Sequence, residues 1–241
     1  MRVLSIIIAT LMAVYFVIAV YYFKEPRQDD PCQRLEVIVT DSLDEHFVSE
    51  GDLHYLLKKE KLYPLGKPMN EINTDKIETA LLKNEMIAEV EAFKTPSGIV
   101  KLEVEQKIPV LRIIGSSGNY YVDNLGTTMP VSNRYAVRVP VATGHINKEF
   151  AKKELYEFAL FLEDNEFWNQ QIEQIHVAQN GDIELIPRVG NQNIVLGSLT
   201  DYKEKLNNLM LFYEQAIPKV GWEKYHTINL KYKNQIVCTK K

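Results

Sequence analysis

The five histidines are the residues with the widest chemical repertoire in this sequence: His46, His54, His145, His176 and His226. No two of them have the spacing of three to five residues that zinc sites favour. We therefore interpret each as a surface histidine or as one whose ring nitrogens form hydrogen bonds within the fold. The sequence predicts no metal site and no cofactor.

Motifs of nucleophilic and phosphate chemistry are missing. The chain contains no Gly-x-Ser-x-Gly, Ser-x-x-Lys or His-Glu-x-x-His pattern. Gly115-Ser-Ser-Gly118 has neither the Gly-Lys-Thr nor the Gly-x-Gly-x-x-Gly context of a phosphate loop, and it indicates a flexible turn. The missing motifs do not exclude an enzyme, but they favour a binding protein without catalytic activity.

The aromatic pair Phe167-Trp168, and Trp222 with Tyr225, have two interpretations. They form a platform for a carbohydrate or peptide, or they close the core of a small β domain, which we favour. Cys32 and Cys238 fit no metal or redox spacing. In an oxidising compartment the two could form a disulfide, but we favour the interpretation that they remain two separate thiols.

Composition excludes several classes of protein. With 46% hydrophobic and 25% charged residues, the chain is neither a disordered polymer, nor a collagen, nor a multi-pass transporter. Of the 28 basic residues, all but Arg2 and Lys24 lie after residue 24, together with all 32 acidic residues, so this part of the chain has a formal net charge of about −6. An acidic balance argues against nucleic-acid binding, which usually requires a basic surface.

The N-terminal run Val3–Phe23 contains no charged residue, Asn, Gln, His, Pro or Gly. As a helix it spans about 31 Å, the thickness of the hydrocarbon core of a bilayer. It is too long for a signal peptide and ends in bulky aromatic residues, so we interpret it as an uncleaved membrane anchor. We expect residues 1–2 inside the cell and the bulk of the chain outside.

The first region after the anchor predicts the order strand, helix, helix, strand, strand. The strands are Leu35–Thr40, Ile87–Phe93 and Ile99–Gln106. The first helix begins at Ser49, which forms a capping pair with Asp52. The second helix is capped by Asn73 or Thr74.

The second region predicts a mainly antiparallel β domain with two helices. The helices run from Lys148 to Glu163 and from Thr200 to Pro218. Asn180-Gly181 is the strongest hairpin signal. A half-buried strand begins at Thr227, and we expect it to run to Cys238 as the last strand of the sheet.

Several spaced motifs together make the chain resemble the bacterial cell-division family FtsQ/DivIB. They are Val104–Val110, Tyr121–Gly126, Gly181–Leu185, Val195–Gly197, Lys205–Leu209 and Ile228–Tyr232. The chain departs from the family at its closing motif, where Asn229-Leu-Lys-Tyr232 replaces the usual Asp-Leu-Arg-Tyr.

The resemblance implies an α+β fold: one transmembrane helix, a POTRA domain (polypeptide-transport-associated) and a β domain. The expected boundaries are a cytoplasmic tail, the transmembrane helix, a linker, the POTRA domain and the β domain at residues 1–2, 3–23, 24–31, 32–107 and 108–241. The implied location is the cytoplasmic membrane at the division septum, with the bulk in the periplasm or outer wall space.

The resemblance further implies a scaffold that recruits FtsB/FtsL-type division proteins and binds neither nucleic acid nor a small-molecule substrate. A terminal strand at a sheet edge offers unpaired N–H and C=O groups to a partner strand. The expected partner-binding residues are Asn229, Leu230, Lys231, Tyr232, Lys233, Asn234 and Ile236. Without the resemblance we would favour an interior or capped strand whose lysines only guard the edge.

The alternative function is a membrane-anchored periplasmic enzyme or chaperone of the cell envelope. It predicts a deep pocket with titrating residues near Asp123, His145 or His176.

Overall fold

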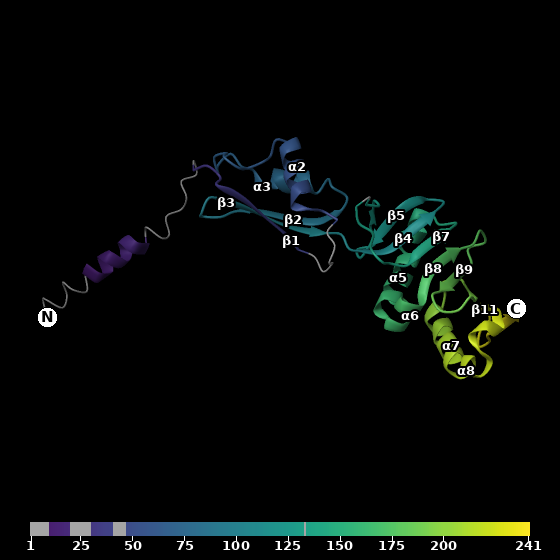
Figure 1. The fold of residues 1–241 in the computed structure, drawn as a ribbon. Helices are drawn as coiled ribbons and strands as arrows, with labels where there is room; N and C mark the ends of the chain where they lie inside the picture. The colour runs from purple at the N-terminus through teal and green to yellow at the C-terminus, as the bar shows by residue number, and fades with distance from the viewer. Residues whose placement is uncertain (1–9, 20–29, 41–46, 133) are drawn as a thin grey trace, which may run out of the picture. The chain divides into compact units, whose positions relative to one another are not determined.

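The computed structural model describes four stretches of the chain: residues 10–19, 30–40, 47–132 and 134–241 (Figure 1). The chain forms two compact units. Of the described residues, those up to 40 and from 48 to 105 belong to the first unit, whereas residue 47 and those from 106 onward belong to the second. Each unit has its own sheet and its own buried apolar residues, and each is described by itself.

The predicted membrane helix Val3–Phe23 is described in part. Residues 10–19 form a helix, whereas residues 3–9 and 20–29, which include most of the predicted linker, lie outside the described residues. Within the part of the chain that the structure describes, no helix is long and apolar enough to cross a membrane.

The first unit has the predicted order strand, helix, helix, strand, strand. Its elements are β1 (Arg34–Thr40), α2 (Glu50–Lys59), α3 (Thr74–Leu81), β2 (Ile87–Lys94) and β3 (Ile99–Gln106). The sheet order is β1-β3-β2, with β1 parallel to β3. Because the turn at 95–98 is too short for a parallel crossover, β2 and β3 run antiparallel.

Both helices of the first unit begin at predicted caps. The Asp52 N–H donates to the Ser49 Oγ at 3.2 Å, and the Ser49 N–H donates to Asp52 Oδ2 at 3.1 Å, which completes a capping box. Asn73, not Thr74, caps α3, because its Oδ1 accepts from the Lys76 N–H at 2.8 Å. The helices bury apolar side chains on one face: Leu53, Leu57, Ile77, Ala80 and Leu81.

The second unit contains one sheet of nine strands among the described residues, in the order β12-β11-β10-β9-β8-β7-β4-β5-β6. The pairs β4–β7, β7–β8 and β10–β11 are parallel and the others antiparallel, so the sheet is mainly antiparallel, as predicted. Its strands are β4 (Pro109–Gly115), β5 (Gly118–Asp123), β6 (Thr128–Met129), β7 (Val141–Gly144), β8 (Ile172–Val177), β9 (Ile183–Pro187), β10 (Asn193–Gly197), β11 (Tyr225–Asn229) and β12 (Val237–Lys240).

The prediction of two helices in the second unit is wrong, because the described residues form more. They are α4 (Lys148–Lys152), α5 (Glu154–Asp164), α6 (Glu166–Gln171), α7 (Tyr202–Gln215), α8 (Ile217–Val220) and the 3-10 helix η1 (Trp222–Lys224). The predicted helix from Lys148 to Glu163 is broken at Lys153, whose backbone leaves the helical region at φ −120° and ψ −83°. The six residues of α6 are too few to show a helical period.

One apolar core joins the helices of the second unit to one face of its sheet. Side chains in register across six strands form a buried row: Ile113, Ala142, Ile175, Leu185, Ile194 and Ile228. Phe158 of α5 and Leu209 of α7 belong to the same core. The sheet is thus held on one face, and its strands present alternate side chains on the other.

The predicted single strand from Thr227 to Cys238 is wrong. β11 ends at Asn229 and β12 begins at Val237, with a loop between them. Asn229 ends β11 because its Oδ1 accepts a hydrogen bond from the Lys231 N–H at 2.9 Å, a local bond that competes with the strand ladder. Asn234, at a φ of +59°, then turns the chain back toward the sheet.

Candidate partner-binding surface at the C-terminal strands

β12 lies at one edge of the nine-stranded sheet, where it pairs antiparallel with β11. The register places Thr227 opposite Thr239 and Ile228 opposite Cys238. On its other side β12 pairs with no strand in the described part of the chain. An edge strand of this kind directs N–H and C=O groups outward, where a further strand can bond to them.

The side chains of β12 anchor the strand by one face only. Cys238 is half-buried and packs against the core of the second unit, and burial raises the pKa of its thiol. Val237 and Thr239 are exposed on the opposite face. Because only one face is anchored, the edge and the other face of β12 are accessible.

Four of the seven residues predicted to bind a partner form the exposed tip of the β11–β12 loop: Lys231, Tyr232, Lys233 and Asn234. Tyr232 exposes 56% of its surface. Asn229 and Ile236 flank the tip and are half-buried. Leu230 is buried, and its N–H donates to the Val195 carbonyl at 2.9 Å, so this residue joins the loop to β10.

A cavity of about 320 Å³ lies between the loop tip and the first turns of α7. All seven residues of the loop line it, from Leu230 to Ile236. The opposite wall consists of Ser198, Thr200, Asp201, Glu204, Lys205 and Asn208. The cavity is large enough for one or two side chains of a bound segment.

The wall from α7 carries both signs of charge, because Asp201 and Glu204 lie beside Lys205. The Lys205 Nζ donates to the Leu196 carbonyl at 3.1 Å and to the Ser198 carbonyl at 2.8 Å. Burial lowers the pKa of Lys205, and Asp201 and Asp182 oppose that shift. Lys205 therefore stabilises the connection between β10 and α7 by hydrogen bonds to its carbonyl groups.

Lys231 is held by the turn between β8 and β9. Its Nζ lies 2.7 Å from Asp182 Oδ2, and this hydrogen bond lowers the pKa of Asp182 and raises that of Lys231. The stem of Lys231 passes so close to Gly197 that a Cβ there would lie 2.7 Å from the Lys231 Cγ. Lys231 thus fixes the loop, whereas Lys233 forms no ion pair with any described residue.

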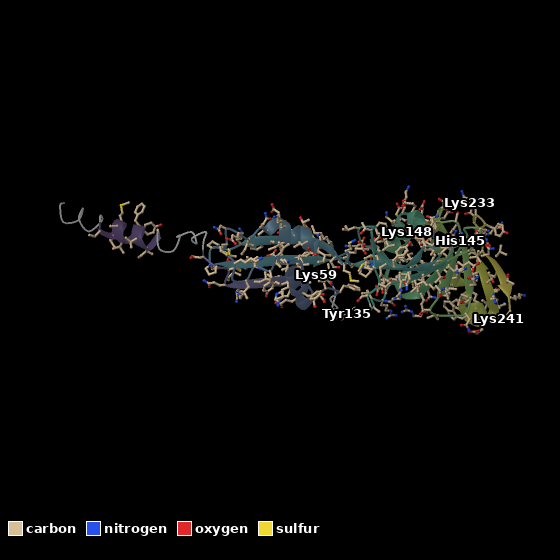
Figure 2. The ribbon with its side chains drawn as sticks, turned by 90° about the horizontal axis from the view of Figure 1, so that it is seen from above. Lys59, Tyr135, His145, Lys148, Lys233 and Lys241 are labelled. Atoms are coloured by element: carbon tan, nitrogen blue, oxygen red, sulfur yellow. The ribbon has the colours of Figure 1, made fainter. Side chains whose placement is uncertain are left out.

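Figure 2 shows the surface positions of Lys233 and Lys241 on the second unit. The Lys241 Nζ contacts Glu223 Oε2 at 2.6 Å, so the end of β12 is joined to η1. Of these two lysines, Lys241 is paired with a carboxylate, whereas the Lys233 ammonium has no carboxylate partner among the described residues. It is the better candidate for attracting an acidic segment.

The residues that an enzyme was expected to use serve the fold in this structure. Asp123 is buried, and its carboxylate contacts the Lys107 ammonium at 3.1 Å and the Thr127 N–H at 2.7 Å. The His176 Nδ1 lies 3.1 Å from the Thr143 Oγ1 on the open face of the sheet. Neither the cavity of about 320 Å³ nor a larger one of about 1060 Å³ is lined by Asp123, His145 or His176.

No group of three or more His, Cys, Asp or Glu side chains that could hold a metal ion occurs among the described residues. Cys32 and Cys238 are both free thiols, the first buried in the first unit and the second half-buried in the second.

The aromatic pairs singled out in the sequence belong mainly to the core. Trp168 is buried, with its ring centroid 6.3 Å from Tyr213, and the Trp222 ring lies 4.9 Å from Tyr213. Phe167 contacts Trp168 edge-on at 4.8 Å but remains partly exposed. A flat platform of stacked aromatic rings does not arise from these contacts.

Sequence reasoning missed two features of this surface, the short strand β12 and the cavity under the loop. The alternation in Val237-Cys-Thr-Lys240 is a usable strand signal, but four residues at a chain end are too few to separate it from the preceding strand. The cavity joins residues some thirty positions apart, and no local pattern encodes it.

Two family models match the chain. The model described as FtsQ/DivIB, C-terminal related, matches residues 108–239, which is more than half of the chain. The model described as POTRA-like domain matches residues 30–105. No curated protein matched the chain.

Proposed function

Because the chain belongs to the FtsQ/DivIB family, we propose that it is a scaffold of the cell-division machinery and not an enzyme. It recruits and links division proteins at the septum through its two extracytoplasmic units. The apolar run Val3–Phe23 anchors it in the cytoplasmic membrane as a single helix, with the N-terminus inside and the bulk in the periplasm or outer wall space.

The observation that carries this proposal is the open edge of β12. Its outer side pairs with no strand among the described residues, and no side chain of the described residues hydrogen-bonds to its backbone. A partner segment adds to this edge as a further strand, which continues the ladder β10-β11-β12.

Side chains beside the edge give the added strand its specificity. Tyr232 is an exposed aromatic residue of the type that dominates interface energies. Lys233 attracts an acidic residue of the partner, and the cavity of about 320 Å³ receives a side chain that follows it. The partner class is the membrane-anchored FtsB/FtsL type.

The test uses the full-length chain and capture of an FtsB-type partner from detergent-solubilised membranes. Tyr232→Ala removes the aromatic contact and leaves the backbone of β12 intact, so we expect about a tenfold loss of capture. Tyr55→Ala is the matched control, because Tyr55 is an exposed tyrosine of α2 in the first unit.

Localisation supplies the second readout. A fluorescent fusion of the wild-type chain gathers at midcell if it is a division scaffold, whereas an envelope enzyme or chaperone gives a uniform signal. Full capture by Tyr232→Ala would contradict the proposed surface, and a uniform envelope signal would contradict the proposed function.

A further inference from the structure

A second and larger hollow occupies the opposite end of the strands from the β8–β9 turn. We call it the arginine groove; its volume is about 1060 Å³, and its walls include Arg138, Val139, Pro140, Phe167, Arg188 and Val189. The segment before β7, the helix α6 and the residues after β9 form it. No residue of β11, β12 or their loop contributes to it.

The two arginines are the chemically distinctive residues of the groove. Arg138 and Arg188 are exposed, and neither side chain forms a hydrogen bond or ion pair with any described residue. A guanidinium has a planar set of donors that matches a carboxylate in two parallel hydrogen bonds. Glu173 is the one carboxylate on the lining, so the groove as a whole attracts anions.

The walls of the groove are held in place by the fold. The Arg188 N–H donates to the Gln171 carbonyl at 2.7 Å, and the Gln171 Nε2 donates to the Val189 carbonyl at 3.2 Å. Gln171 itself is buried. Phe167 is fixed by its contacts with Trp168 at 4.8 Å and Tyr213 at 6.3 Å. These contacts fix the wall formed by α6 and the residues after β9, so that binding a ligand mainly orders the two arginine side chains.

The groove also leaves apolar surface in contact with water. Phe167 exposes 39% of its surface and Val189 exposes 53%. A simple inorganic anion would satisfy the arginines and leave these side chains uncovered. A ligand that uses both features carries carboxylates next to a bulky apolar group.

We propose that the arginine groove binds an acidic segment of a partner protein in which carboxylates flank an apolar side chain. The carboxylates pair with Arg138 and Arg188, and the apolar side chain covers Phe167 and Val189. A nucleic acid requires a longer basic stripe than two arginines beside a glutamate. This site is separate from the β12 edge and goes beyond the proposed function.

The test measures peptide binding to the full-length chain by isothermal titration. The first peptide has the core Glu-Leu-Asp-Phe-Glu, the second has Gln-Leu-Asn-Phe-Gln, and the third has Glu-Gly-Asp-Gly-Glu. We expect the first to bind at least tenfold more tightly than either of the others, because only the first supplies both carboxylates and apolar side chains. Equal binding of the first two would overturn the charge pairing, and equal binding of the first and third would overturn the apolar contact.

Variants locate the site. Arg138→Glu and Arg188→Glu are expected to weaken the first peptide at least tenfold each, and Arg188→Lys less, since an ammonium lacks the bidentate fork. Lys219→Glu changes the charge equally at an exposed lysine outside the groove and serves as the control. Unchanged affinity in both arginine variants, or no binding of the first peptide at millimolar concentration, would overturn the proposal.

The two proposals fail separately. Capture of the FtsB-type partner through β12 does not depend on the groove, so Arg138→Glu retains it if the variant is folded. Tyr232→Ala retains the affinity for the first peptide. A variant that loses both properties has lost its fold, which a thermal melt detects, and the milder Arg188→Lys then decides between the outcomes.

Discussion

Each sheet has two edge strands, β1 and β2 in the first unit and β12 and β6 in the second, and the edges of β2 and β12 differ in how side chains cover them. In the first unit, the edge strand β2 is closed by side chains: the Ala92 N–H donates to Glu78 Oε1 of α3 at 2.8 Å. The Lys94 Nζ at the end of the same strand donates to the Met69 carbonyl at 2.6 Å. In the second unit, no such contact reaches the backbone of β12 from the described side chains.

The difference shows which edge is available for strand addition. A carboxylate on a backbone N–H blocks that donor to any other strand, in the way that proteins protect edges from unwanted pairing. Among the described residues, β12 is protected by its shortness and by Lys240 at its end. One outward donor of β2 is therefore blocked by a carboxylate, whereas no described side chain blocks the edge of β12, which a chosen partner can use.

The largest expected effect comes from closing the β12 edge with proline. Successive residues of a strand point their N–H groups to opposite sides, so Thr239→Pro and Lys240→Pro remove one outward and one inward donor. The variant that loses the outward donor keeps its melting temperature and loses partner capture about thirtyfold, or about 2 kcal/mol, because the ring also interrupts the neighbouring bonds. The other variant loses a bond to β11 and melts earlier.

Capture assays and thermal melts on the two variants check this prediction. Proline is tolerated on an edge strand only where its missing N–H faces solvent. The variant whose melting temperature is unchanged is therefore the one whose replaced residue directs its N–H outward. If the variant with the unchanged melting temperature captures the partner like wild type, the β12 edge is not the binding site.

Opening the β2 edge is expected to have a smaller effect on stability. Glu78→Ala leaves the Ala92 N–H without its carboxylate acceptor and lowers the free energy of unfolding by about 1.5 kcal/mol, the lower end for a hydrogen bond to a charged group, because the bond is only partly buried. Urea denaturation measures this change, and sedimentation detects self-association through the opened strand. Glu85→Ala, an exposed glutamate outside the elements, is the control. Equal stability of the two variants would mean that Glu78 does not close the edge.

Much of the fold could be predicted from the sequence because its signals are local. The capping box at Ser49 and Asp52 uses residues three positions apart, and the turn at Asn180-Gly181 joins β8 to β9, with Gly181 at a φ of +85°. The order of the first unit follows from alternation and helical period in the same way. These signals need no tertiary contact to operate.

The binding surface could be predicted only in part because it is set by contacts between distant residues. The pattern Thr227–Tyr232 alternates as a strand does, but Asn229 bonds locally to the Lys231 N–H and ends the strand early. The Lys231 ammonium then pairs with Asp182, forty-nine positions away. A sequence pattern shows that Lys231 is charged and leaves open whether the charge faces a partner or the protein itself.

The smallest expected effect tests that last assignment, the ion pair between Lys231 and Asp182. The Lys231 hydrogen bond lowers the pKa of Asp182 in the folded protein. The contribution of this carboxylate to folding stability is therefore fully present above its unfolded pKa, about 3.9, and is lost as the pH falls through the lower folded value. Lys231 has a raised pKa, so its contribution is lost only in strong alkali. The loop should therefore keep its conformation at neutral pH and loosen in acid.

Amide resonances of residues 230–236 follow this directly. In the wild type we expect them to shift with a midpoint below about pH 3.9, and in Asp182→Asn this transition disappears. Partner capture should fall only a few-fold in Asp182→Asn, since exposed ion pairs contribute little, and it should recover in the swapped pair Asp182→Lys with Lys231→Asp. Lys219→Ala is the control for loss of a surface lysine. Recovery in the swap means that Lys231 positions the loop, whereas continued loss means that Lys231 itself contacts the partner and the β12 surface has a second cation beside Lys233.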